Sequence, residues 1–436
     1  MPVALPPRRR LRLAGTATAA LLALTIPTTA SAAAATTRPA GNAAEAAASR
    51  SGLDREALEA TLKAFHDAGM YGAYSAVRKG AAGWQGASGV ADIDTERPTT
   101  PQMRHRIGSI TKTFTAVGVL REVGKGRIAL DAPIGRYLPD LAPGARGRAI
   151  TVRMLLNHTS GIGDYSEAIF ATEDSVEGNR SHQFDPQELA RLGLKAKPLG
   201  KPGRAHHYSN TNFVLAGLLL QKVTGKSPQA YITEHVIRKA GLRHTHFPRS
   251  AHLTGPHAKM YEAAYGRFTP PRDFSVYNMS WAGTAGSLVS TMADLNRFYR
   301  ALLGGELLAP AQLRQMKTTV PTENNTLRYG LGLFQKRLPC GEFWGHNGLV
   351  LGAMTWSLSS PDGRRQMSLG FNLTRYQKLD GNGIPQTSPV DTAMDAHVAQ
   401  ALCGRDDGRL PDQPDTHPPH PLLAGPQERP LPVRHQ

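Results

Sequence analysis

An alternation of apolar and hydroxyl residues is the clearest pattern in the sequence and lies toward its end. Met354, Trp356 and Leu358 alternate with Thr or Ser. A Pro-Asp-Gly turn follows at residues 361–363, and a second apolar run covers residues 366–373. A period of two places the apolar side chains on one face of a strand. The two runs and their turn therefore predict an antiparallel β-hairpin.

A second pair of strand-like runs lies nearer the start, at residues 71–79 and 84–90. Helical patterns dominate the middle, and strand patterns resume at Tyr329. Strands at both ends predict an α/β fold in which the two ends build one sheet, with a helical insertion at roughly residues 125–285. We expect one folded domain over residues 51–403, and we find no internal repeat in it.

The two termini differ from this domain in composition. Four arginines within residues 8–12 precede an uncharged stretch, and we interpret residues 1–32 as a cleaved export signal rather than a stable membrane anchor. The sequence leaves the general secretory and twin-arginine routes open. Residues 33–50 read as an Ala-rich linker, and the Pro-rich residues 404–436 as a disordered or processed tail. The protein is thus expected to be secreted.

Charge and cysteine content narrow the possible partners. The 436 residues carry a formal net charge of +17, but the basic residues are scattered among acids and glycines. Without long Lys/Arg runs, a nucleic acid partner is disfavoured, and an anionic cell-wall surface fits an exported protein better. The only cysteines, Cys340 and Cys403, cannot form a zinc cluster. One disulfide or two buried thiols remain open.

A candidate catalytic pair lies at residues 109–112, Ser-Ile-Thr-Lys, which open a helical pattern. At about 100° per residue, Arg121, Glu122 and Lys125 share one face, and Lys112 lies about 180° from Arg121 among apolar positions. We expect Lys112 to point inward, where an ammonium group costs several kcal/mol unless it is paired or neutralised.

Ser109 lies one helical turn before Lys112, with its Cβ about 5 to 6 Å away. The amine can then act on the hydroxyl, which makes Ser109 a candidate nucleophile. The start of a helix also supplies backbone N–H donors for an oxyanion. The alternative is that Ser109 only caps the helix and Lys112 extends to solvent.

A second motif, Tyr208-x-Asn210, precedes an apolar helical pattern and is expected on a loop. There Tyr208 can transfer a proton, and Asn210 can orient a substrate amide. Alternatively, Asn210 only caps the next helix.

The third motif, His346-x-Gly348, leads into the late hairpin. A glycine lets a substrate backbone approach a strand, and His346 offers a donor or acceptor beside it. A flexible turn with a solvated histidine is the alternative. Tyr208 alone of 12 tyrosines begins Y-x-N, and His346 alone of 16 histidines begins H-x-G.

The order S-x-x-K, Y-x-N, H-x-G resembles the serine β-lactamase and penicillin-binding-protein superfamily. The Leu-Leu-Asn-His-Thr-Ser-Gly stretch at residues 155–161 and the segment at residues 282–295 match its class C-like branch, which includes soluble actinomycete D-alanyl-D-alanine carboxypeptidases. The resemblance covers roughly residues 52–403. It implies an antiparallel sheet flanked by helices, an all-helical subdomain and a site in the cleft between them.

The resemblance also implies roles for the motif residues. Ser109 is expected to be the acylated nucleophile, Lys112 its activating partner and Tyr208 the proton shuttle. No metal or other cofactor is required. Cys340 and Cys403 are expected to form one disulfide, as in secreted relatives.

Four further residues are expected to bind the substrate. Asn210 would hold the substrate amide, and His346, followed by Gly348, would replace the cationic residue of related K-T-G motifs. The backbone N–H of Leu349 would complete the oxyanion hole with that of Ser109.

The implied activity is a D-alanyl-D-alanine carboxypeptidase that acts on peptidoglycan stem peptides and is acylated by β-lactams. However, Leu349 and Phe334 stand where such enzymes commonly have a hydroxyl residue and a carboxylate-binding arginine. Lys336 or Arg337 could replace that cation, but their direction is open. A small neutral ester or amide substrate therefore becomes more plausible, and an esterase, a β-lactamase and a non-catalytic wall-binding protein remain alternatives.

Overall fold

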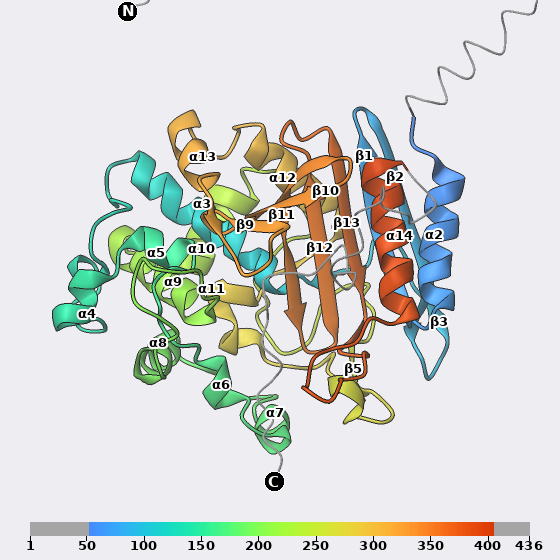
Figure 1. Ribbon diagram of the computed structural model, residues 1–436, viewed down its shortest axis with the longest axis horizontal. Coiled ribbons are helices and arrows are strands. Elements are labelled where there is room, and N and C mark those ends of the chain that lie inside the picture. Colours follow the sequence, from blue (N-terminus) through green and yellow to red (C-terminus); the bar gives the residue numbers. More distant parts are fainter. Residues whose placement is uncertain (1–51, 405–436) are drawn as a thin grey trace, which may run out of the picture. The chain divides into compact units, whose positions relative to one another are not determined.

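A nine-stranded antiparallel sheet organises the computed structural model, which describes residues 52–404 (Figure 1). Its order is β3-β2-β1-β13-β12-β11-β10-β9-β8. The early hairpin is β1 (Gly72–Lys79) with β2 (Ala82–Asp92), and the late hairpin is β12 (Ala353–Ser359) with β13 (Arg365–Phe371). Because β1 pairs with β13, the prediction that both ends of the domain build one sheet is confirmed.

The other strands are mostly short. They are β3 (Arg97–Pro98), β4 (His105–Arg106), β5 (Tyr261–Glu262), β6 (Arg272–Asp273), β7 (Val289–Ser290), β8 (Val320–Pro321), β9 (Leu327–Tyr329), β10 (Phe334–Leu338), β11 (Gly341–Val350) and β14 (Leu373–Thr374). The helices are α2 (Arg55–Asp67), α3 (Thr111–Gly124), α4 (Gly144–Ala149), α5 (Val152–Leu156), α6 (Ser166–Ile169), α7 (Glu173–Gly178), α8 (Pro186–Lys195), α9 (Asn210–Thr224), α10 (Pro228–Ile232), α11 (Gly283–Gly286), α12 (Met292–Leu303), α13 (Pro310–Met316) and α14 (Pro389–Cys403).

The predicted signal, linker and tail lie outside the described residues, except for Gly404 at the start of the tail. Within residues 52–404, no helix has both the length and the apolar character needed to cross a membrane.

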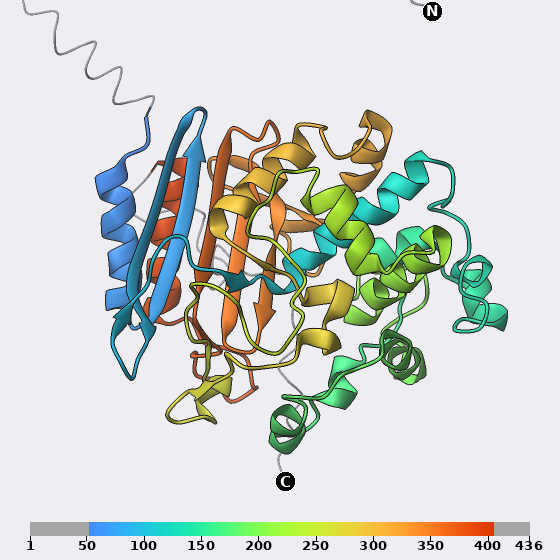
Figure 2. The same cartoon turned by 180° about the vertical axis from the view of Figure 1, so that it is seen from behind.

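Helices cover both faces of the sheet, so the late hairpin is buried on both sides. On one face, Trp356 and Leu358 pack in a core shared with α2 and α14. On the other face, where Figure 2 shows α12 lying across the sheet, the hydroxyl residues are buried too. Ser357 hydrogen-bonds Ser368 at 2.7 Å, and Ser368 donates to Asn296 of α12 at 2.8 Å. The polar half of the alternation therefore faces a polar helix surface rather than water.

Helix α3 is buried on nearly its whole surface. Its N-terminus follows a 3₁₀ turn at Gly108–Ile110. Glu122, expected with Arg121 and Lys125 on the polar face, is also buried. Its carboxylate pairs with Lys125 at 2.9 Å and accepts a hydrogen bond from Tyr231 of α10. Neighbouring helices thus enclose α3, and a polar stripe does not by itself mean exposure.

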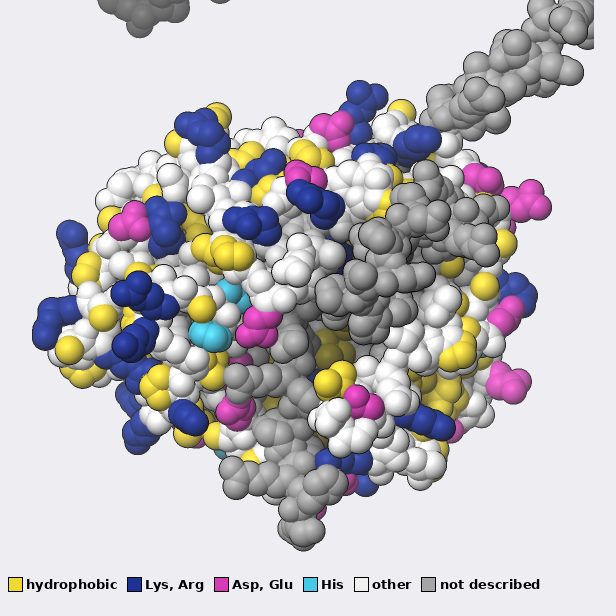
Figure 3. Space-filling model, viewed as in Figure 1, with side chains coloured by type: hydrophobic (Ala, Val, Ile, Leu, Met, Phe, Trp, Pro, Cys, Tyr) yellow, Lys and Arg dark blue, Asp and Glu magenta, His cyan; other side chains and the backbone are white. Residues whose placement is uncertain are grey.

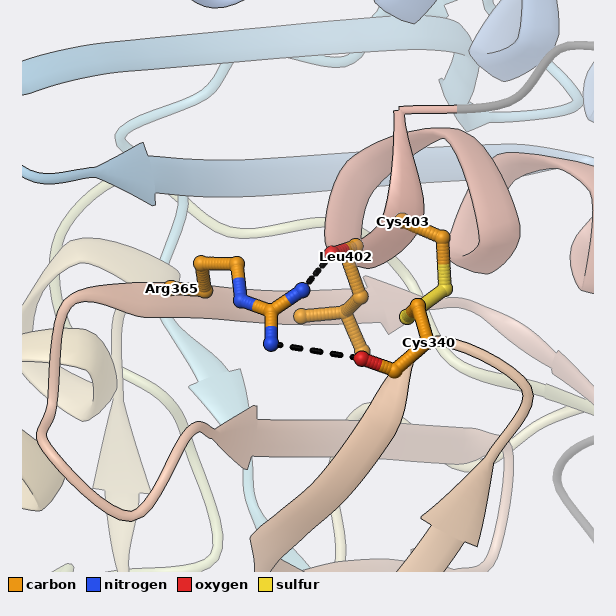
Figure 4. Close-up of a disulfide and its surroundings, with 4 residues drawn as sticks. All are labelled: Cys340, Arg365, Leu402 and Cys403. Carbon is orange, nitrogen blue, oxygen red and sulfur yellow. Dashed lines mark hydrogen bonds between the residues drawn. A yellow bond between two sulfur atoms is a disulfide. The ribbon is translucent and has the colours of Figure 1, made fainter. Parts of the chain in front are cut away.

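The predicted disulfide is confirmed between Cys340, at the turn that joins β10 to β11, and Cys403, the last residue of α14 (Figure 4). Their Cα atoms are 5.5 Å apart. Arg365 of β13 donates to the carbonyls of Cys340 and Leu402, each at 3.4 Å. Closing a loop with a sequence separation of 63 residues lowers the entropy of the unfolded chain, a contribution of about 4 kcal/mol in the chain-entropy model.

Candidate active site

Ser109 and Lys112 lie side by side where the 3₁₀ turn leads into α3. Lys112 is fully buried, and its Nζ is 2.8 Å from Ser109 Oγ. Nζ also donates to Asn210 Oδ1 and to the carbonyl of Ala285, each at 2.8 Å. The prediction that Lys112 points inward is confirmed. The capping alternative does not hold, because Ile110 occupies the N-cap of α3 and Lys112 does not reach solvent.

The partners of Lys112 suit proton transfer. Asn210 Oδ1 and the Ala285 carbonyl can only accept hydrogen bonds, whereas the Ser109 hydroxyl can accept or donate. An ammonium group can therefore donate to all three, and a neutral amine can donate to two and accept from Ser109. Since both protonation states fit the same positions, a proton can move between Oγ and Nζ without rearrangement of the site.

Tyr208 lies on the loop before α9, as predicted. Lys112 Nζ is 4.8 Å from the centre of its ring. The Tyr208 ring also packs against the ring of His158, and the two ring centres are 4.2 Å apart. His158 Nδ1 accepts hydrogen bonds from the Ser209 backbone at 3.2 Å and from Asn212 Nδ2 at 3.1 Å. Burial places the pKa of His158 well below its usual value, so a neutral imidazole supports the Tyr208 loop.

Asn210 connects Lys112 to Asp164, a residue that the sequence motifs did not single out. Its backbone N–H and its Nδ2 donate to Asp164 Oδ2, at 2.8 and 3.1 Å. Because a carboxylate only accepts, the amide nitrogen must face Asp164, which turns Oδ1 toward Lys112. The alternative in which Asn210 caps α9 does not hold, since Ser209 is the N-cap residue. Asp164 lies three residues beyond the stretch at 155–161, which is the signal that could have located it.

His346 lies inside strand β11 and is fully buried, so a solvated turn is excluded. Tyr329 Oη lies 2.7 Å from His346 Nε2, and His346 Nδ1 lies within hydrogen-bonding distance of the Asn347 carbonyl. The carbonyl can only accept, so Nδ1 carries the proton and Nε2 accepts from Tyr329. Burial lowers the pKa of His346 to about 3. The imidazole is therefore neutral, unlike the cation of K-T-G motifs. Sequence reasoning missed Tyr329 as a site residue, because no recognisable motif surrounds it in the sequence.

Two glycines bring the start of α3 against β11. Gly108 has φ +50°, and a Cβ there would lie 2.8 Å from the backbone nitrogen of Leu349. A Cβ at Gly348 would lie 2.8 Å from the backbone nitrogen of Ser109 and 2.0 Å from the carbonyl oxygen of Ile107. Only glycine permits this approach. It places the backbones of Ser109 and Leu349 together, as an oxyanion hole requires.

Comparison with known proteins agrees with this geometry. The family model described as Beta-lactamase matches residues 56–377. The chain belongs to the β-lactamase family. Among solved structures, the chain is similar to a D-stereospecific amidohydrolase from Streptomyces sp., with 35% identity and a TM-score of 0.70, over 81% of this chain and 99% of that chain.

Three other relatives of this β-lactamase-family chain are more distant in sequence. The D-amino acid amidase from Ochrobactrum anthropi SV3, in complex with L-phenylalanine amide, is 27% identical with a TM-score of 0.68, over 80% of this chain and 98% of that one. Penicillin-binding protein 4* of Bacillus subtilis (strain 168) is 26% identical over 64% of this chain and 63% of its own length. Protein flp of Staphylococcus aureus (strain MW2) is 28% identical, and the match spans 41% of its length. The chain thus has the fold of serine β-lactamases and penicillin-binding proteins.

Neither of the two strand cations proposed to bind a substrate carboxylate lies near Ser109 in this β-lactamase-family fold. Lys336 is opposite Phe343 and faces the core covered by α2 and α14, where burial lowers its pKa to about 8. Phe334 pairs with Gly345, next to His346. Arg337 is exposed three residues further, roughly 10 Å along the strand. Lys336 therefore points away from the site, whereas Arg337 lies on the face of His346 but further along the strand, where its guanidinium is 3.9 Å from the Glu342 carboxylate.

Proposed function

We propose that this chain is a secreted serine hydrolase that cleaves amides and esters of D-configured amino acids through an acyl-enzyme, with preference for an uncharged leaving group. The observation that carries the proposal is the buried contact of 2.8 Å between Lys112 Nζ and Ser109 Oγ. The names of the Streptomyces and Ochrobactrum relatives support a D-configured acyl donor. The neutral His346 and the distant Lys336 and Arg337 support an uncharged leaving group.

In the proposed reaction, Lys112 reacts in its neutral amine form: Ser109 Oγ attacks the substrate carbonyl carbon while its proton passes to Lys112 Nζ. The backbone N–H groups of Ser109 and Leu349 stabilise the oxyanion. Tyr208 gives a proton to the leaving amine or alcohol as its bond to the carbonyl breaks, and Lys112 restores the proton of Tyr208. Water then attacks the acyl-enzyme, its proton returns by the same groups to Ser109 Oγ, and the carboxylic acid leaves. Asn210 binds the substrate on one side, and strand β11 with the neutral His346 lines the other side.

A D-alanyl-D-alanine carboxypeptidase that is acylated by β-lactams is the second candidate. The similarity to penicillin-binding protein 4* and the stretch at residues 155–161 favour it. A carboxypeptidase requires a cation that binds the terminal carboxylate of the substrate. Neither Lys336 nor Arg337 is placed to supply that cation. The two candidates therefore differ in the charge of the leaving group that they accept.

The deciding experiment compares one acyl donor with two leaving groups. Wild type and Ser109→Ala are incubated with a peptide that ends in D-Ala-D-Ala and with the same peptide as its C-terminal amide, alongside L-configured controls. We expect release of D-alaninamide at least about tenfold faster than release of D-alanine, with both lost in Ser109→Ala. Faster release of D-alanine, with stable labelling by penicillin, would establish the carboxypeptidase instead. Turnover that survives in Ser109→Ala would overturn both.

An extracellular location belongs to the same proposal. The disulfide between Cys340 and Cys403 is of a kind that persists in oxidising compartments. No acidic residue occurs between Glu188 and Glu234. Lys and Arg side chains gather on the left of Figure 3, over the part where Figure 1 draws α4 and α8. A basic surface of this kind supports an anionic cell-wall environment.

A further inference from the structure

The Asp164 carboxylate divides its hydrogen bonds between two tasks. Oδ1 accepts from the backbone N–H and the hydroxyl of Ser166, at 2.9 and 2.8 Å, which closes the local turn. Oδ2 accepts from the backbone N–H and the side chain of Asn210, at 2.8 and 3.1 Å. Within residues 52–404, no Lys or Arg forms an ion pair with Asp164. One of the two carboxylate oxygens, Oδ2, therefore accepts both of its hydrogen bonds from Asn210.

The orientation of the Asn210 amide determines whether an oxygen or an NH₂ group faces Lys112 Nζ. An amide presents an oxygen on one side and an NH₂ group on the other, and rotation by about 180° exchanges them. With Oδ1 toward Lys112, the amide accepts from Nζ. With the NH₂ group toward Lys112, two donors would face each other in a buried site, which is unfavourable. A carboxylate behind the amide excludes this second orientation because it cannot donate.

We propose that Asp164 is a positioning residue that acts through Asn210 to hold Lys112 Nζ against Ser109 Oγ. The inference rests on the proposed function of these two residues. Asp164 makes no contact with the reacting atoms. It fixes one acceptor of Lys112, while the Ala285 carbonyl of α11 fixes another. These two acceptors, at the start of α9 and in α11, hold the Lys112 amino group beside the Ser109 hydroxyl.

The test is a double-mutant cycle with Asp164→Ala, Asn210→Ala and the double variant, measured on a p-nitrophenyl ester and on a D-amino acid amide. We expect Asp164→Ala to lower kcat about 10- to 100-fold with KM within about threefold, because a small misplacement of a catalytic group has effects of this size. In the Asn210→Ala background the same change should cost less than about twofold. Fully additive losses would overturn the proposal.

Two matched variants separate positioning from a structural role. Ser166→Ala removes a partner of Oδ1 but leaves the contacts of Oδ2, and we expect kcat within about twofold of wild type. Asp164→Asn keeps the size of the side chain but adds an NH₂ donor that also permits the flipped Asn210 amide, so it should recover only a minor part of the loss seen in Asp164→Ala. An equal loss in Ser166→Ala, with matching loss of thermal stability, would show that Asp164 only stabilises the loop and would overturn the proposal.

A readout without substrate distinguishes failure of this inference from failure of the proposed function. In protein labelled with ¹⁵N-asparagine, the Asn210 side-chain N–H groups should exchange with water more slowly in wild type and Ser166→Ala than in Asp164→Ala. Absence of any Ser109-dependent turnover would refute the proposed function alone. Equal exchange rates in all three proteins would refute the positioning role alone.

Discussion

The two walls of the site differ in charge. The wall built from α3, α9, α11 and the loop at Asp164 holds the Lys112 ammonium among oxygen acceptors. The wall built from β9, β10 and β11 holds a neutral imidazole, His346, between Tyr329 and Phe334. Burial is the main reason that His346 is neutral, and the charge of Lys112 adds to the effect. One buried cation thus disfavours a second one beside it.

This difference bears on specificity. A cation in the strand wall would attract a substrate carboxylate, whereas a neutral imidazole with both nitrogens engaged offers little to an anion. In the proposed function, the helix wall carries the reacting groups and the strand wall selects the leaving group. Each of the following changes alters one wall and should leave the other intact.

Removal of the cation from the helix wall should have the largest effect. We expect Lys112→Ala to lower kcat/KM for the D-amino acid amide about 1,000-fold or more, because general acid–base catalysis contributes factors of about 100 to 10,000. The matched control is Lys336→Met, which removes the other buried lysine, on the opposite face of the sheet. It should retain activity within about threefold. Equal losses in both variants would contradict the assignment.

Acid should destabilise the folded protein, because the strand wall keeps His346 neutral. The folded-state pKa of His346 is about 3, against about 6.5 in the unfolded chain, so the unfolded state binds more protons between these values. The stability contribution is complete above about pH 6.5 and is lost as the pH falls toward 3. At pH 5 the free energy of unfolding should be about 2 kcal/mol lower for each such histidine. His105, with a pKa also lowered to about 3 by burial, behaves alike.

Urea unfolding at pH 7.5 and pH 5.0 measures this effect. In His346→Gln, the stability difference between the two pH values should shrink by about 2 kcal/mol relative to wild type. An unchanged difference would mean that His346 is not neutral in the folded protein, and the contrast between the walls would disappear.

The smallest expected effect comes from Tyr329→Phe, which removes the donor to His346 Nε2 but keeps the ring. The free energy of unfolding should fall by about 1 kcal/mol, since one buried hydrogen bond is lost. The preference for the C-terminal amide over the carboxylate should change less than about threefold. A shift of the preference toward the carboxylate would show that Tyr329, and not burial alone, keeps the strand wall neutral.

Local patterns predicted the parts of this protein that depend on neighbours in the chain. A period of two identified the late hairpin, strand-like runs indicated the early one, and the three-residue spacing in a helix placed Ser109 beside Lys112. The resemblance added the disulfide and the joint site of three distant motifs. Even so, periodicity placed Glu122 on the face of α3 opposite Lys112 and could not show that it is buried, because a pattern within one helix does not reveal which neighbours cover it.

The remaining features depend on contacts between distant segments. Asp164 meets Asn210 across 46 positions, and Tyr329 reaches His346 from a strand that is not its direct neighbour. The direction of Lys336 follows from the register of β10 on β11, since a shift by one residue would turn it to the other face. The protonation of His346 follows from complete burial. The motifs therefore identify which residues belong to the candidate site. The orientation and the charge state of these residues are decided only by the tertiary structure, because packing removes water and brings their partners together.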